Sequence, residues 1–131
     1  MNISIIDSQD QGKVIEVLTI KDTYELAALI KNENWSPGEF NNGRRTNNTF
    51  KKTEIFALDV DDGCTLAQAK ETFAKYKHVI ATSKSHQKSK GGVVADRFRV
   101  VLFLDRPIHS DGEYKATFAH LKGLFPFIDD A

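Results

Sequence analysis

Residues 54–63 form a predicted strand in which a short apolar run is followed by alternating hydrophobic and acidic residues, and which ends in acidic residues. Phe56, Leu58 and Val60 share one face of this strand, because successive side chains of a strand point to opposite faces. Asp59 and Asp61 then share the other face, roughly 6–7 Å apart. Such close carboxylates repel each other unless a cation lies between them, and hard divalent ions prefer oxygen ligands. The pattern indicates a metal site; the alternative is a polar turn that ends an ordinary strand.

The first 52 residues are predicted to form a β-hairpin, a helix and a polar loop. In order, these elements are a strand at 3–6, a strand at 14–20, a helix at 22–31 and a loop at 32–52. Asp22 and Glu25 have the spacing of a capping box, which favours a helix start at that point. A long segment without regular structure in a compact domain is usually functional or mobile. We expect Trp35 and Phe40 to pack this loop against the domain.

Residues 53–131 follow the order strand, helix, strand, strand, helix and the start of another strand. The corresponding segments are 54–60, a helix from 65, 78–82, 97–104, a helix from about 111, and 127–129. This is the order of the split βαβ, ferredoxin-like or RRM-like fold. In that fold the first and third strands are antiparallel neighbours and the helices cover one face. We therefore expect one α+β domain over residues 1–131, with Asp59 and Asp61 beside Arg97 and Arg99 on an open face.

Composition narrows the class of protein. Lys and Arg together equal Asp and Glu at 18 each, so any basic surface must be local. A single cysteine, Cys64, excludes an internal disulfide and suits a reducing compartment. No apolar run approaches the roughly 20 residues that span a bilayer, and Met1–Ser4 lacks the charged start of a signal peptide. We expect a cytoplasmic protein without membrane contact.

Basic and acidic side chains near the two aspartates are candidates for phosphate chemistry. Arg97 and Arg99 suit a triphosphate because planar guanidinium groups grip oxyanions in pairs; the alternative is an ion pair with a neighbouring aspartate. His86 lies in a lysine-rich loop after the strand at 78–82, where it is either a phosphate ligand or simply solvated. Asp129 or Asp130 enters at the sheet edge as a third carboxylate, or belongs to a frayed terminus.

Four segments, in order, resemble the motifs of archaeo-eukaryotic-type primases, the primase-polymerases of phages and plasmids. They are the D-h-D run at 56–61, the His-bearing segment at 81–87, the Arg-bearing strand at 96–101 and the hydrophobic-Asp segment at 127–129. The resemblance covers roughly residues 50–131 and implies that they form the catalytic palm. Lys84 stands where the family usually has a small residue. Because the family normally continues beyond the third motif, we expect either a shortened relative or a fragment of a longer chain.

The resemblance implies metal-dependent nucleotidyl transfer on a single-stranded DNA template, with a helicase domain or subunit as a partner in many members. By resemblance, two Mg²⁺ or Mn²⁺ ions would be held by Asp59, Asp61 and Asp129. The nucleoside triphosphate would be held by His86, Arg97, Arg99, Lys84 and Lys88. Candidates for nucleic-acid contacts are Arg44, Arg45 and Lys90.

Two other functions fit parts of the pattern. Asp59-Val60-Asp61 after a strand imitates a phosphohydrolase of the haloacid dehalogenase type, in which Asp59 would be the nucleophile on a parallel sheet. A non-catalytic palm would instead bind nucleic acid or protein, with Val101 and Phe103 exposed on the open face of the sheet.

Overall fold

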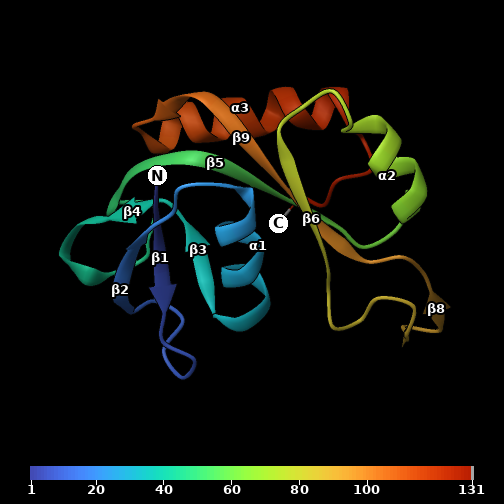
Figure 1. Ribbon diagram of the computed structural model, residues 1–131, viewed down its shortest axis with the longest axis horizontal. Coiled ribbons are helices and arrows are strands. Elements are labelled where there is room, and N and C mark those ends of the chain that lie inside the picture. Colours follow the sequence, from blue (N-terminus) through green and yellow to red (C-terminus); the bar gives the residue numbers. More distant parts are fainter. Residues whose placement is uncertain (131) are drawn as a thin grey trace.

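The computed structural model describes residues 1–130 as a mixed α+β fold with three α-helices and antiparallel sheets (Figure 1). The helices are α1 (Thr23–Asn32), α2 (Leu66–Thr72) and α3 (Asp111–Leu124). The strands are β1 (Asn2–Ile6), β2 (Val14–Thr19), β3 (Trp35–Pro37), β4 (Glu39–Phe40), β5 (Phe50–Val60), β6 (His78–Thr82), β7 (Ser89–Lys90), β8 (Val93–Val94) and β9 (Phe98–Ile108).

The helices begin where the capping residues predict. The Asp22 carboxylate accepts a hydrogen bond from the backbone N–H of Glu25 at 2.9 Å. At α2, Thr65 and Gln68 form a complete capping box, since each side chain accepts the backbone N–H of the other residue. These bonds satisfy donors that the first turn of a helix leaves open. None of the helices within residues 1–130 is long and apolar enough to cross a lipid bilayer.

The central sheet has the strand order β4-β5-β9-β6, and each neighbouring pair is antiparallel. The predicted pairing of β5 with β9 is therefore confirmed, and its register places Asp59 opposite Arg99. An antiparallel sheet rules out the parallel arrangement that a phosphohydrolase of the haloacid dehalogenase type requires. Phe127–Asp129 do not form the predicted further strand; only the Asp129 N–H bonds to β5, at the Asp59 carbonyl oxygen, at 2.8 Å.

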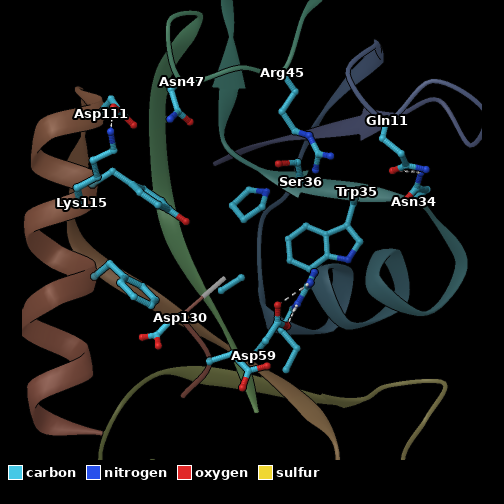
Figure 2. Close-up of a pocket in the computed structure, with 16 residues that line it drawn as sticks. Gln11, Asn34, Trp35, Ser36, Arg45, Asn47, Asp59, Asp111, Lys115 and Asp130 are labelled. Atoms are coloured by element: carbon cyan, nitrogen blue, oxygen red, sulfur yellow. Dashed lines mark hydrogen bonds and ion pairs between the residues drawn. The ribbon is translucent and has the colours of Figure 1, made fainter. Parts of the chain in front are cut away.

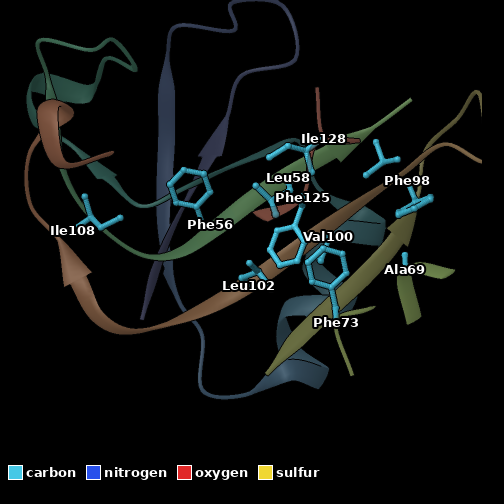
Figure 3. Close-up of a cluster of buried hydrophobic side chains, with 11 residues drawn as sticks. Phe56, Leu58, Ala69, Phe73, Phe98, Val100, Leu102, Ile108, Phe125 and Ile128 are labelled. Atoms are coloured by element: carbon cyan, nitrogen blue, oxygen red, sulfur yellow. The ribbon is translucent and has the colours of Figure 1, made fainter. Parts of the chain in front are cut away.

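One face of this sheet packs against α2 and α3, as predicted, and Figure 3 shows the buried hydrophobic side chains that gather on this face. Phe56 and Leu58 of β5 meet Val100 of β9 in a cluster that Phe73 and Ile128 complete, all at most 2% exposed. The Phe56 ring stacks on Tyr114 of α3 with centroids 4.5 Å apart. Because these side chains alternate with Asp59 and Arg99 along the strands, burying them turns the two polar residues toward the opposite face.

That opposite face is not open, which corrects the sequence-based expectation. The second sheet, in the order β2-β1-β3, packs there together with α1. Val101 is fully buried and Phe103 is partly buried against this N-terminal unit, defined here as residues 1–49. A binding surface built on exposed Val101 and Phe103 is therefore wrong. Burial of apolar area drives this second layer, and it leaves only the rim of the face, near Asp59 and Arg99, accessible.

The segment 32–52 is more ordered than its polar composition predicts. It contains β3, β4 and a short 3₁₀ helix, η1 (Asn41–Gly43), and β5 starts within it at Phe50. Trp35 is 8% exposed, so it packs as expected. Gly38 has φ +86°, and a Cβ there would lie 2.3 Å from the carbonyl oxygen of Lys52. Only glycine therefore permits the close approach of this segment to β5.

Candidate functional site

Three aspartates meet at the end of β5. Asp59 is the penultimate residue of the strand, and Asp61 follows it on the same side. After α3 the chain returns to the end of β5, where the Asp129 N–H donates to the Asp59 carbonyl oxygen at 2.8 Å. The fold thus brings together the first and last acidic segments that sequence analysis selected. Asp130 differs from them, because its carboxylate pairs with Lys122 at 3.4 Å.

The Asp129 carboxyl group interacts electrostatically with the carboxylates of Asp61 and Asp59. Burial raises the pKa of Asp129, and the negative charge of Asp61, a side-chain hydrogen bond with Asp61 and the charge of Asp59 raise it further. The Lys122 ammonium opposes these effects on the pKa of Asp129. Clustered carboxylates resist simultaneous ionisation unless a proton or a cation lies between them. The raised pKa of Asp129 thus reflects burial together with a local excess of negative charge at this end of β5.

Two basic side chains neutralise part of this charge. The Arg99 Nε donates to Asp59 Oδ1 at 2.6 Å, and Arg99 Nη2 lies 3.3 Å from Asp59 Oδ2. The Arg99 guanidinium also lies over the Trp35 ring, 5.5 Å from its centroid. Lys90 Nζ pairs with Asp61 Oδ2 at 3.2 Å. Arg99 and Lys90 thus lie beside the carboxylates. A metal ion, or phosphates bound to it, would compete with them for these positions.

The donor set fits a hard divalent cation, because it consists of carboxylate oxygens that repel one another. In the arrangement of residues 1–130, however, no three His, Cys, Asp or Glu side chains are gathered tightly enough to coordinate a metal ion. Asp59 is turned toward Arg99 and Asp61 toward Lys90. Coordination by Asp59, Asp61 and Asp129 therefore requires both carboxylates to exchange their ion-pair partners for the metal.

His86 lies in the segment between β6 and β9 that also contains the small hairpin β7-β8. Its Nδ1 accepts the backbone N–H of Arg97 at 3.1 Å. A neutral imidazole held in this way carries its proton on Nε2, which can then donate to an anion. The bond explains how a loop histidine acquires a defined orientation.

Arg97 is buried, with 3% of its surface exposed. Its guanidinium donates to the carbonyl oxygens of Ser85 at 2.9 Å, Lys88 at 2.6 Å and Val93 at 2.8 Å. Arg97 thus holds the segment between β6 and β9 in shape, and only Arg99 of the predicted arginine pair contacts Asp59. A contact between Arg97 and a nucleotide stays a prediction that would require some of these bonds to break.

The remaining basic residues that were predicted to contact nucleotide or nucleic acid lie in two places: three lysines between β6 and β9, and two arginines in the N-terminal unit. Lys84 and Lys88 are exposed on the segment that Arg97 organises, as is Lys90, which pairs with Asp61. Arg44 is bound to Asp10 at 2.9 Å. Arg45 is half-buried and its side chain points toward Trp35 and Ser36 (Figure 2). Of the two neighbouring arginines, only Arg45 lines the cavity described next.

A groove of about 620 Å³ leads away from the aspartates along β5. Asp59 and Asp130 lie at one end and Arg45 and Asn47 at the other (Figure 2). Its two walls are formed by α3 and by the N-terminal unit. The side chains that line the groove and that sequence analysis did not select include Trp35, Tyr114, Lys115 and Phe118.

The sequence gives little indication that these unselected residues would line a groove. Trp35 stood out as the chain's only tryptophan within a polar stretch, but nothing in the sequence placed it beside Arg99. Tyr114 and Phe118 have the spacing of a buried helix face, and only the packed structure shows that they also line a cavity. Burial raises the pKa of the Tyr114 hydroxyl, which therefore stays protonated and can donate a hydrogen bond.

Comparisons of this chain with family models, with curated proteins and with solved structures find no match.

Proposed function

We propose that this chain is a metal-dependent nucleotidyl-transfer palm of the primase-polymerase type. The observation that carries the proposal is the meeting of Asp59, Asp61 and Asp129, from segments far apart in the sequence, beside Arg99. The pairing of β5 with β9, and of β9 with β6, is consistent with an RRM-like palm. The order of the four motif-like segments supports the same assignment.

Asp59, Asp61 and Asp129 would hold Mg²⁺ or Mn²⁺. Bound divalent ions of this kind lower the pKa of an attacking hydroxyl and neutralise charge on a leaving pyrophosphate. Arg99, released from Asp59, would donate to phosphate oxygens, because a guanidinium binds oxyanions in pairs. His86 would add a donor from Nε2.

In the proposed reaction, a 3′-hydroxyl oxygen attacks the α-phosphorus of a nucleoside triphosphate. A new phosphodiester bond forms, the bond from the α-phosphorus to its bridging oxygen breaks, and pyrophosphate leaves while the hydroxyl proton passes to solvent. The single-stranded DNA template would select the nucleotide. Lys84 and Lys88 would contact phosphates; both are exposed, and they belong to the segment that also carries His86.

The test is calorimetric titration of a nucleoside triphosphate with and without Mn²⁺, using the wild type and the double variant Asp59→Ala/Asp61→Ala. We expect binding that requires both the metal and the two aspartates. Asp105→Ala is the matched control, because Asp105 is an exposed aspartate of β9 six residues from Arg99, about 20 Å along the strand. The control is expected to bind like the wild type.

Template-directed primer extension then tests catalysis. Incorporation that Asp59→Ala/Asp61→Ala abolishes and Asp105→Ala leaves intact would support a polymerising palm. Metal-independent nucleotide binding, or binding unaffected by the double variant, would refute the proposed site. Retention of single-stranded DNA binding by an inactive wild type would favour the non-catalytic nucleic-acid-binding function instead.

A further inference from the structure

The groove along β5 extends well beyond the groups that phosphates and metal ions would contact. We propose that it binds the base and sugar of a nucleotide whose phosphates lie at Asp59, Asp61 and Asp129, and that the N-terminal unit supplies half of this site. The inference rests on the proposed function for the location of the phosphates. It assigns a role in substrate binding to residues 1–49, which lie outside the motif-like segments.

The groove exists because β5 lacks a full partner on one edge. β4 pairs with β5 only through Glu39 and Phe40, so the rest of this edge faces the space between α3 and β3. The groove volume of about 620 Å³ lies within the roughly 300–1,000 Å³ that is usual for small-molecule sites. A second cavity of about 150 Å³ shares Ser36, Asn47 and Tyr114 with it. This space suits a single nucleotide rather than a duplex.

Aromatic side chains line both walls of the groove. Tyr114 is held by stacking on Phe56, with ring centroids 4.5 Å apart, so its ring is fixed before a ligand arrives. Trp35 is packed in the N-terminal core and lines the groove beside Arg99. Rigid aromatic walls next to polar groups are the usual surroundings of a nucleobase, because every base has a flat π-face.

Arg45 closes the end of the groove farthest from Asp59 (Figure 2). Its backbone is anchored, since the Arg45 N–H donates to the Gly12 carbonyl oxygen at 2.8 Å. Within residues 1–130 its guanidinium makes no ion pair, whereas that of Arg44 pairs with Asp10. A guanidinium without an ion-pair partner, carried on an anchored backbone, can donate to base acceptors or to a sugar hydroxyl. Arg45 is therefore the polar group that would recognise the nucleoside.

The experiment compares ATP with inorganic tripolyphosphate, which carries the phosphates without base or sugar. Both are titrated calorimetrically in Mn²⁺ into the wild type, Arg45→Ala and the matched control Arg44→Ala. We expect the wild type to bind ATP at least about tenfold more tightly than tripolyphosphate, and Arg45→Ala to weaken ATP binding by about tenfold, the loss of one charge-assisted hydrogen bond. Tripolyphosphate binding by Arg45→Ala, and both titrations of Arg44→Ala, should match the wild type.

Emission from Trp35, the only tryptophan in the chain, gives a second readout on the unmodified protein. Both ligands should change this emission, because Arg99 lies over the Trp35 ring and would move to phosphate, and ATP should change it further because its base reaches the ring. Equal affinities of the wild type for the two ligands, or equal effects of Arg45→Ala and Arg44→Ala, would overturn the proposal. Equal weakening of both ligands by Arg45→Ala would also overturn it, by making Arg45 a phosphate ligand.

The experiment can distinguish an error in the proposed function from an error in the assignment of the groove as a nucleoside site. If neither ligand binds in a metal-dependent way, adenosine is titrated without metal while Trp35 emission is followed. Saturable binding that Arg45→Ala weakens would uphold a nucleoside site independent of nucleotidyl transfer. No binding of adenosine in that case would reject the groove as well.

Discussion

Removal of the Arg99 guanidinium is expected to change metal binding and nucleotide binding in opposite directions. In the metal-free protein Arg99 contacts both carboxylate oxygens of Asp59, at 2.6 and 3.3 Å. Asp59 is also a proposed metal ligand, so a metal ion must displace the guanidinium. Once displaced, Arg99 becomes a donor for phosphate. Arg99→Ala therefore removes a competitor of the metal and a ligand of the nucleotide at the same time.

The sizes of the two effects follow from the exposure of the pair. The Arg99 and Asp59 side chains are 38% and 41% exposed, so their ion pair contributes about 0.2–1 kcal/mol. Loss of that competition should tighten binding of Mn²⁺ alone by about 1.5- to 5-fold. Loss of charge-assisted hydrogen bonds to phosphate, about 1.5–3 kcal/mol, should weaken binding of the triphosphate about 10- to 150-fold. The lost contact with Trp35 adds about 0.5–1 kcal/mol to the destabilisation of the fold.

The assay is calorimetric titration of Mn²⁺ alone and of the triphosphate in saturating Mn²⁺. Arg106→Ala is the matched control, because Arg106 is an exposed arginine of the same strand, β9. It should leave both affinities unchanged. Weaker binding of Mn²⁺ alone by Arg99→Ala would refute the displacement argument, and an unchanged affinity for the triphosphate would refute the phosphate contact.

Two further outcomes follow from the groups around the site. The pKa of Asp129 is raised in the folded protein, so the folded state holds a proton that the unfolded state releases. The stabilisation that Asp129 contributes is fully present below its pKa in the unfolded chain, about 3.9. It is lost as the pH rises through the higher pKa of Asp129 in the folded protein. In urea unfolding of the metal-free protein from pH 3 to 7, Asp129→Asn should lose this part of the pH dependence. Arg97→Ala should cost about 1–3 kcal/mol, because three partly buried hydrogen bonds to carbonyl oxygens lose their charged donor. It should also speed proteolysis within residues 83–96, whereas Arg99→Ala should not.

The central sheet could be predicted because its signal is local. Leu58 and Val60 alternate with Asp59 and Asp61, and Phe98 and Val100 flank Arg99 in the same way on the partner strand. A period of two fixes which side chains share a face, and the order of elements then determines which strands are neighbours. The position of Asp59 opposite Arg99 follows from these two rules together.

The placement of the N-terminal unit could not be predicted from a local pattern. Val101 and Phe103 continue the face that carries Arg99, and their apolar character was a sign that something covers it. Which segment does so depends on contacts between residues far apart in the sequence, such as the pairing of Ser4 with Ser36 that joins β1 to β3. The role of Arg97 was equally hidden, because its three carbonyl partners belong to a segment whose conformation no periodic pattern specifies.

These two unpredicted features change how the site is understood. The face of the sheet opposite α2 and α3 is divided: Ile55 and Val101 lie buried beneath the N-terminal unit, while Asp59 and Arg99 lie at its rim. Trp35 stands at the boundary, since it belongs to the buried cluster and also lies against the Arg99 guanidinium. The same layer that shields the apolar part of the sheet therefore orients the arginine beside the carboxylates. The N-terminal unit, which the motif-like segments leave out, thus contributes Trp35 and Arg45 to the lining of the candidate site.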